Sequence, residues 1–470
     1  MPGTTSRSSS RSCRRRIPDG ARRRRSRADR MRRCSGRAMT TIRTLVMTAL
    51  LAGAWWPAVT AAQSTTADNH IAYYERLLQR NPRDARTYHR LGDAFIRKAR
   101  ETGDLTDFAR AETALRKALA LAPGNAGALR HLAYVFYSRH EFAEAVAEAT
   151  KALALDPADA DTHGVLGDAY LELGRYGEAE IAYEKMMARE ADLYSHGRRA
   201  GLRSVRGDTA GAIADLQRAI EIGKAARRPS ESVAWAQWQL GVEHFTIGEL
   251  DLAEARYQDA LETQPHYYRA LAGLAQVRAA RQRYDEAVDL YPKALAVIPM
   301  PEYAAALGDV LTKLSRRDEA RKYYELVEYI GRLGAVNRVI YNRELAYFYA
   351  DHDRELGAAL DLARKELAVR KDVYAYDVLA WALLKNGQPA EARAAMAEAL
   401  RVGTKDARLF FHAGMIEARL GNRDAARQHL ERALATNPFF HVVHADGARQ
   451  TLRELEDGSR PLTTARGDGQ

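Results

Sequence analysis

The strongest constraint on the fold of this chain is a repeat with a period near 34 residues. Pairs of a leucine and a small residue recur along the sequence, and their small members are Gly92, Ala133, Gly167, Gly241, Ala275, Gly308, Ala346 and Ala380. Two Ala-Gly pairs extend the series at Gly201 and Gly414, and successive small residues lie 41, 34, 34, 40, 34, 33, 38, 34 and 34 positions apart. A spacing of this length predicts an array of helical units that pack on their neighbours.

A second series of small residues follows the first at a nearly constant distance in sequence. Alanines follow the small residue of their unit by nineteen positions at Ala111, by eleven at Ala212 and by twelve at Ala145, Ala179, Ala253, Ala287, Ala320, Ala358, Ala392 and Ala426. A short polar break separates the two series, and many units close with a proline, which cannot continue a helix. Each unit therefore predicts a helix, a tight turn, a second helix and a stop.

Gly167 illustrates why the small residues are needed. A glycine inside a helix costs about 0.5–1 kcal/mol relative to alanine, so its presence needs a reason. Small residues on both helices of a unit allow the two backbones to approach, and larger side chains then fill the remaining space. Tyr170 and Tyr183 are the expected fillers in this unit.

These motifs resemble those of the tetratricopeptide repeat family. The family pattern of Leu-Gly, aromatic residues, alanines and a closing proline is visible in "WQLGVEHFTIGELDLAEARYQDALETQP" and, with departures, in nine further units. The resemblance implies an all-α fold, a right-handed superhelical solenoid of about ten helix-turn-helix repeats over residues 70–438, followed by a capping helix at 439–457. Residues 458–470 are predicted to be a disordered tail.

The first 62 residues differ in composition from the rest. Residues 39–62 combine Arg43, an apolar run over 45–56 and small residues near their end, the pattern of a secretory signal peptide cleaved after Ala61 or Ala62. We therefore expect a periplasmic or secreted protein, and no stable membrane insertion, because the run is too short to span a bilayer. Residues 1–38 form a basic, Arg- and Ser-rich extension with three interpretations: untranslated sequence before a start at Met39, a long n-region or organelle presequence, or a disordered basic arm that binds nucleic acid.

The formal net charge of +11 comes from this N-terminal segment. The first 62 residues hold fifteen Arg and two Asp, so the remainder carries 57 basic and 59 acidic side chains. That balance predicts no nucleic-acid partner for the body of the protein. Both cysteines, Cys13 and Cys34, also lie in the segment, which leaves the body without a disulfide or a thiolate ligand.

Motifs that carry catalysis are missing from the sequence. It contains no Walker-type phosphate loop, no His-Glu-x-x-His zinc motif and no Gly-x-Ser-x-Gly elbow. His441 and His444 have a spacing compatible with one metal ion, but two ligands do not make a site. We therefore expect no enzymatic activity, no cofactor and no metal.

The resemblance implies that function lies on the first helix of each unit, which lines the concave groove of such arrays. Residues three before, one after and four after the small residue are expected to face this groove. They include a peptide-binding set of Arg130, Tyr134, Tyr137, Asp168, Arg198, Trp238, Phe245, Asp309, Arg343, Tyr347, Asp377, Trp381 and Phe411. Aromatic side chains beside arginine are typical of peptide-binding surfaces, and Trp238 and Trp381 are the two strongest candidates.

Three functions remain open at this point. The first is an exported, monomeric scaffold without enzymatic activity that binds a protein or peptide in the groove. The second is a structural subunit of a cell-envelope assembly, against which the capping helix argues because a capped end does not polymerise. The third is a carbohydrate-binding or enzymatic protein built on a helical array.

Overall fold

The computed structural model describes residues 66–102, 104–336 and 342–457. Within these ranges the chain folds into 22 α-helices and no β-strand, which confirms the all-α prediction. None of these helices combines the length and the apolar character needed to cross a bilayer. The predicted basic extension (1–38), signal peptide (39–62) and tail (458–470) lie outside the described residues.

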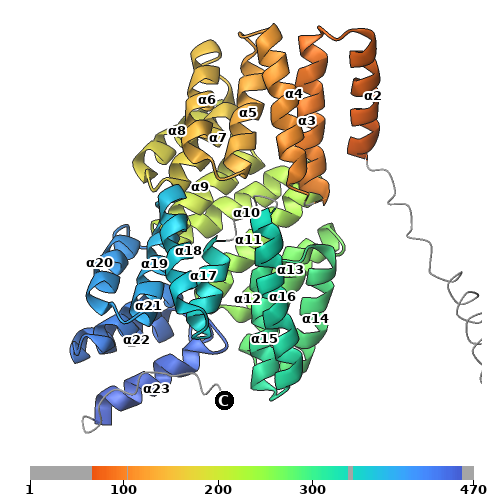
Figure 1. The fold of residues 1–470 in the computed structure, drawn as a ribbon. Helices are drawn as coiled ribbons and strands as arrows, with labels where there is room; N and C mark the ends of the chain where they lie inside the picture. Colours follow the sequence, from red (N-terminus) through yellow and green to blue (C-terminus); the bar gives the residue numbers. More distant parts are fainter. Residues whose placement is uncertain (1–65, 103, 337–341, 458–470) are drawn as a thin grey trace, which may run out of the picture. The chain divides into compact units, whose positions relative to one another are not determined.

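Twenty of the described helices form ten consecutive hairpins, one for each repeat (Figure 1). In chain order they are α3 (Ala85–Thr102) with α4 (Thr106–Leu121), α5 (Ala126–Ser138) with α6 (Phe142–Leu155), α7 (Ala160–Glu172) with α8 (Tyr176–Arg189), α9 (Leu193–Val205) with α10 (Thr209–Ala225), α11 (Ser230–Thr246) with α12 (Leu250–Thr263), α13 (Tyr268–Ala280) with α14 (Tyr284–Val297), α15 (Pro301–Lys313) with α16 (Arg317–Val336), α17 (Asn342–Asp351) with α18 (Leu356–Val369), α19 (Val373–Lys385) with α20 (Pro389–Leu400), and α21 (Ala407–Arg419) with α22 (Arg423–Thr436). Helix α2 (Thr66–Arg80) packs on α3, and α23 (His444–Asp457) packs on α22. The helices therefore pack mainly on their neighbours in sequence.

The glycines of the first helices face large side chains of the second helices. A Cβ atom at Gly167 would lie 2.4 Å from the ring of Tyr183, a separation that no real Cβ contact shows. The same close contact recurs with the residue sixteen positions later in the pairs Gly241–Tyr257, Gly308–Tyr324 and Gly414–Leu430. Glycine inside these helices thus makes room for a bulky side chain of the partner helix.

Replacement of Gly167 by leucine is expected to lower the free energy of unfolding by about 1–3 kcal/mol, because the new side chain overlaps the Tyr183 ring. Gly201→Leu is the matched control, since Gly201 also lies inside a first helix but has no atom of another helix within 4 Å of its Cβ position. The control is expected to be neutral or slightly stabilising, because leucine favours helix. Urea unfolding followed by circular dichroism measures both variants, and equal losses would contradict this packing.

Two positions of the predicted small-residue series are wrong by one residue. In the Ala-Gly pair of α9 the buried residue is Ala200, not Gly201, and it lies twelve positions before Ala212 like its counterparts in other repeats. In α18 the buried alanine is Ala359, while Ala358 is exposed. The second shift arises because the turn before α18 is longer and holds two residues with a left-handed backbone, Asp353 and Glu355.

Three hairpin turns in the first half of the array contact loops from the second half. At the turn between α7 and α8, the backbone N–H of Lys371 donates to the carbonyl oxygen of Glu172 at 2.9 Å. At the α9–α10 turn, the Thr404 hydroxyl donates to the carbonyl oxygen of Val205. At the α11–α12 turn, the side-chain amide of Asn437 donates to the carbonyl oxygen of Phe245. Partners in the three contacts are 199, 199 and 192 residues apart, so consecutive early repeats meet consecutive late loops.

A glycine with a left-handed backbone stands at each of these three turns. Gly174, Gly207 and Gly248 have φ angles of 68°, 74° and 79°. A Cβ atom at Gly174 would lie 2.1 Å from the carbonyl oxygen of Lys371, and one at Gly207 would lie 2.2 Å from that of Gly403. Other hairpin turns have a non-glycine residue with a positive φ, such as His140 and Gln282, so the close approach of the late loop is what requires glycine at the first two turns.

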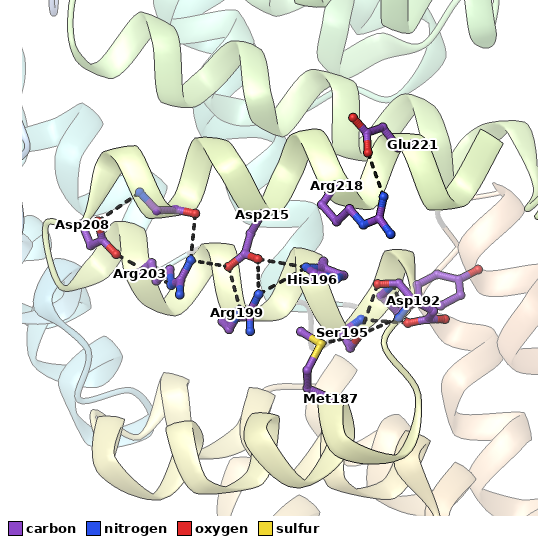
Figure 2. Close-up of polar contacts among 12 residues, drawn as sticks. Met187, Asp192, Ser195, His196, Arg199, Arg203, Asp208, Asp215, Arg218 and Glu221 are labelled. Atoms are coloured by element: carbon purple, nitrogen blue, oxygen red, sulfur yellow. Dashed lines mark hydrogen bonds and ion pairs between the residues drawn. The ribbon is translucent and has the colours of Figure 1, made fainter. Parts of the chain in front are cut away.

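The α9–α10 hairpin, whose repeat lacks the leucine of the leucine-small pair, is joined by a buried ion network (Figure 2). Asp215 on α10 is 3% exposed and lies 2.9 Å from His196 Nδ1, 2.8 Å from Arg199 Nε and 2.9 Å from Arg203 Nη1, all on α9. Although burial acts to raise it, hydrogen bonds from Arg199 and His196 hold the pKa of Asp215 below its usual value. Asp215 is the shared acceptor of three side chains of α9, so the network links the two helices of this hairpin. Removal of Asp215 would leave the guanidinium groups of Arg199 and Arg203 without this carboxylate.

Candidate functional site

The residues predicted to bind a peptide all lie on first helices, but their charged members are engaged within the chain. Three ion pairs connect a first helix to the next repeat: Arg130–Asp159 at 3.1 Å, Arg198–Asp168 at 2.9 Å and Arg343–Asp372 at 2.8 Å. Although burial acts to lower it, Asp372 and Glu366 raise the pKa of Arg343. These side chains join neighbouring repeats, and their role in peptide binding stays a prediction.

The aromatic members of the predicted set differ in exposure. Tyr134, Tyr137 and Trp238 are half-buried, whereas the buried members are Phe245, Tyr347, Trp381 and Phe411. Trp381 was expected to be open to a ligand, and its exposure of 3% corrects that expectation. Its ring stacks on His412 of α21 with centroids 4.2 Å apart, and its Nε1–H donates to Asp351 at 2.7 Å. The ring of Trp381 is therefore covered by the next repeat.

Trp381 borders a group of imidazoles and carboxylates that joins α15, α17, α19, α21 and the start of α23. We call this group the histidine–aspartate cluster, and its members are Asp309, Asp351, His352, Asp377, His412, His441 and His444. Asp377, a predicted site residue, is buried and accepts hydrogen bonds from the Tyr347 hydroxyl at 2.6 Å and from His412 Nδ1 at 2.9 Å. The cluster thus links polar side chains of successive repeats across their first helices.

Asp309 is a second carboxylate of this cluster that pairs with a histidine. It accepts hydrogen bonds from the Tyr324 hydroxyl at 2.9 Å and from His352 Nε2 at 2.7 Å. Although burial acts to lower it, the hydrogen bond to Asp309 raises the pKa of His352 to about 9. His352 is therefore positively charged at neutral pH and forms an ion pair with Asp309.

A second group lies on the first helices α11, α13 and α15. We call it the aromatic–arginine patch, and it consists of the half-buried side chains of Trp238, Tyr268, Arg269 and Tyr303. The Arg269 guanidinium lies 4.9 Å from the ring centre of Trp238 and 5.1 Å from that of Tyr268. Within the described part of the chain Arg269 forms no salt bridge, although Tyr268 is a hydrogen-bond partner and Glu302 acts on its charge. The guanidinium has five donors and can therefore also meet a carboxylate or a carbonyl oxygen beside aromatic faces.

Comparison with known families identifies the repeat. A family model described as a tetratricopeptide repeat matches residues 96–160, 239–305 and 378–439, and a second model of that description matches residues 136–200. The chain is a tetratricopeptide repeat protein. A search of curated proteins finds no match to this tetratricopeptide repeat protein.

Solved structures share the helical fold of this tetratricopeptide repeat protein. The human IFIT1 dimer with PPP-AAAA is 15% identical, with a TM-score of 0.45 and coverage of 71% of this chain and 77% of that chain. Yeast Tom70 is 14% identical, with a TM-score of 0.35 and coverage of 84% and 93%. The APC/C hetero-tetramer Cut9-Hcn1 is 14% identical, with a TM-score of 0.31 and coverage of 82% and 92%. At these identities the likeness concerns the fold alone.

Three of the four patch residues were not among the predicted site residues of this tetratricopeptide repeat protein. The residues predicted to face the groove form a row on each first helix, and this row began three residues before the small residue, as at Trp238. Arg269 lies six residues before Ala275, and Tyr268 and Tyr303 lie at similar distances before the small residues of their repeats. Side chains three or four residues apart share one face of a helix. Extending the row by one helical turn toward the N-terminus would have included Tyr268 and Arg269, whereas Tyr303, five residues before Gly308, does not share that spacing.

Proposed function

We propose that this tetratricopeptide repeat protein is an exported scaffold without enzymatic activity that binds a protein or peptide at the aromatic–arginine patch. The observation that carries the proposal is Arg269, a half-buried guanidinium between the rings of Trp238 and Tyr268 that pairs with no carboxylate of the described residues. Trp, Tyr and Arg are the residues enriched at the centres of protein interfaces. A chain segment with an apolar side chain next to a carboxylate or a carbonyl oxygen would satisfy both parts of the patch.

Phage-displayed random peptides provide the probe for this proposal. They are selected on the wild-type protein, and the enriched peptides are then bound to the double variant Trp238→Ala/Arg269→Ala. The control is Arg218→Ala, which removes an exposed arginine of α10 that pairs with Glu221 at 3.0 Å. Loss of two interface anchors is expected to weaken binding by at least about tenfold, while the control binds like the wild type. Equal binding to all three proteins, or no enrichment on the wild type, would overturn the proposal.

The proposal of export rests on the signal-peptide pattern of residues 39–62. Cleavage after Ala61 or Ala62 would release the repeat array into a periplasm or outside the cell. N-terminal sequencing of protein recovered from the periplasmic fraction and from the culture medium tests this step. A mature chain that begins at Ala62 or Gln63 is expected, and exported protein that retains residues 1–60 would contradict it.

A further inference from the structure

Three members of the histidine–aspartate cluster bring donor atoms together from distant parts of the sequence. Asp351 is the last residue of α17, whereas His441 and His444 lie just before and at the start of α23. One carboxylate oxygen and one nitrogen from each ring all lie within 4.8 Å of one another. Two imidazole nitrogens and a carboxylate oxygen form a donor set that suits Zn²⁺ and related divalent ions, with water at a fourth position.

The spacing of one pair already matches that of metal ligands. His444 Nε2 lies 3.3 Å from Asp351 Oδ1. Two donors of a tetrahedral zinc site with bonds of about 2.0–2.1 Å are about 3.3–3.4 Å apart. His441 is the ligand that has to move closer, by about 1.4 Å at most. The side chains of Asp351 and His441 keep 16% and 28% of their surface exposed, so this group of donors borders on solvent.

Coordination through Nε2 of His444 requires the imidazole proton on Nδ1. Its Nδ1 atom is buried and has no hydrogen-bond partner among the residues that the structure describes. Without a metal, a proton on Nε2 faces the Asp351 carboxylate at 3.3 Å, and binding an ion through Nε2 moves that proton to Nδ1. In that tautomer Nε2 directs a lone pair toward Asp351, as a metal ligand requires.

To bind a metal, His441 has to give up the hydrogen bonds that its ring accepts at the start of α23. Its Nδ1 lies 3.2 Å from the backbone nitrogen of Val443 and 3.3 Å from that of His444, and it accepts from both at the start of α23. In this arrangement the proton is on Nε2, which lies 3.7 Å from Asp309 Oδ2. Coordination through Nε2 requires the proton on Nδ1, so the ring leaves these amides as it approaches the ion.

Surrounding side chains hold two of the three donors in place. The Nε1–H of Trp381 donates to Oδ1 of Asp351 at 2.7 Å and fixes the carboxylate. The ring of Phe411 stacks on His444 with centroids 4.8 Å apart and an interplanar angle of 20°. Such outer contacts orient metal ligands and limit the movement needed for binding.

We propose that Asp351, His441 and His444 bind one divalent transition-metal ion, for which Zn²⁺ is the reference, and that the ion fastens the segment before α23 to the end of α17. The three ligands come together only in the folded chain. Bound metal therefore stabilises the folded state and leaves the unfolded state largely unaffected.

The experiment uses the full chain, purified without a polyhistidine tag and freed of metal with a chelator. Zn²⁺ is titrated in competition with a chromophoric chelator, and thermal unfolding is recorded with and without Zn²⁺. The ligand variants are His441→Gln and Asp351→Asn. The matched control is His266→Gln, which removes an exposed histidine between α12 and α13. Circular dichroism verifies that each variant is folded.

We expect the wild type and the His266→Gln control to bind one equivalent of Zn²⁺ and to melt at a higher temperature with it. Each ligand variant should bind at least about 100-fold more weakly and show no such rise. Mg²⁺ should not reproduce the effect, because it prefers oxygen ligands. Binding by His441→Gln that equals the wild type, or Mg²⁺ acting as well as Zn²⁺, would overturn the proposal. His441→Gln keeps the test decisive if Asp351→Asn does not fold, because the His441 side chain is half-exposed.

Discussion

Truncation of Trp381 to alanine is expected to lower the free energy of unfolding by about 3–5 kcal/mol. The ring is buried against His412, with centroids 4.2 Å apart, and against Phe411 at 5.8 Å. Truncation leaves a cavity between α19 and α21 and removes the Nε1–H donor from Asp351. Urea unfolding of the full chain, followed by circular dichroism, measures the loss.

Trp238→Ala is the matched control for this prediction. Trp238 is also a tryptophan of a first helix, but it is half-buried and its main polar neighbour is the Arg269 guanidinium above its ring. Its truncation is expected to cost less than about 2 kcal/mol, because less apolar surface returns to water. Similar losses in the two variants would contradict the burial that the structure assigns to Trp381.

Replacement of Gly207 by alanine is expected to destabilise the protein by about 2–4 kcal/mol. A left-handed backbone costs a non-glycine residue about 1–2 kcal/mol. The new methyl group would also lie 2.2 Å from the carbonyl oxygen of Gly403, so one of the two loops has to move. Hydrogen exchange should report lost protection at both loops of this contact, although they are far apart in sequence.

Gly387→Ala separates the two causes of that loss. Gly387 has a φ of 76°, close to the 74° of Gly207, but has nothing within 4 Å of its Cβ position. Gly387→Ala is therefore expected to lower the free energy of unfolding only by the cost of the left-handed backbone, about 1–2 kcal/mol. If Gly207→Ala and Gly387→Ala lose the same stability, the contact between early turn and late loop contributes nothing.

The helical period and the hairpins could be predicted because the same short sequence pattern recurs in every repeat. Gly167 was correctly expected to adjoin a bulky residue of the second helix, and Tyr183 is that residue. Gly201 was assigned because it is the second residue of an Ala-Gly pair, and Ala358 because it lies twelve residues after Ala346. The turn before α18 has one extra residue, which makes Ala359 face the first helix, and this extra residue can be recognised only in the fold.

The candidate sites were less predictable because their members come from different repeats. His441 and His444 were recognised as a pair, but their third partner, Asp351, is 90 residues earlier and carries no motif. Trp381 has the position of a groove residue, and its burial depends on His412 one repeat later. Sequence spacing gives the face of a helix, whereas exposure depends on what the next repeat places against that face.

The contacts between early turns and late loops also affect how this array unfolds. In an open repeat array each unit contacts only its neighbours, so unfolding proceeds unit by unit from the ends. Here a hydrogen bond joins Lys371 to Glu172 across 199 residues, and two further contacts of similar span follow it. Loosening of the loop before α19 therefore reaches the α7–α8 turn without passing through the five repeats between them. The array gains long-range cooperativity, and its contact order rises above that of a purely local helical stack.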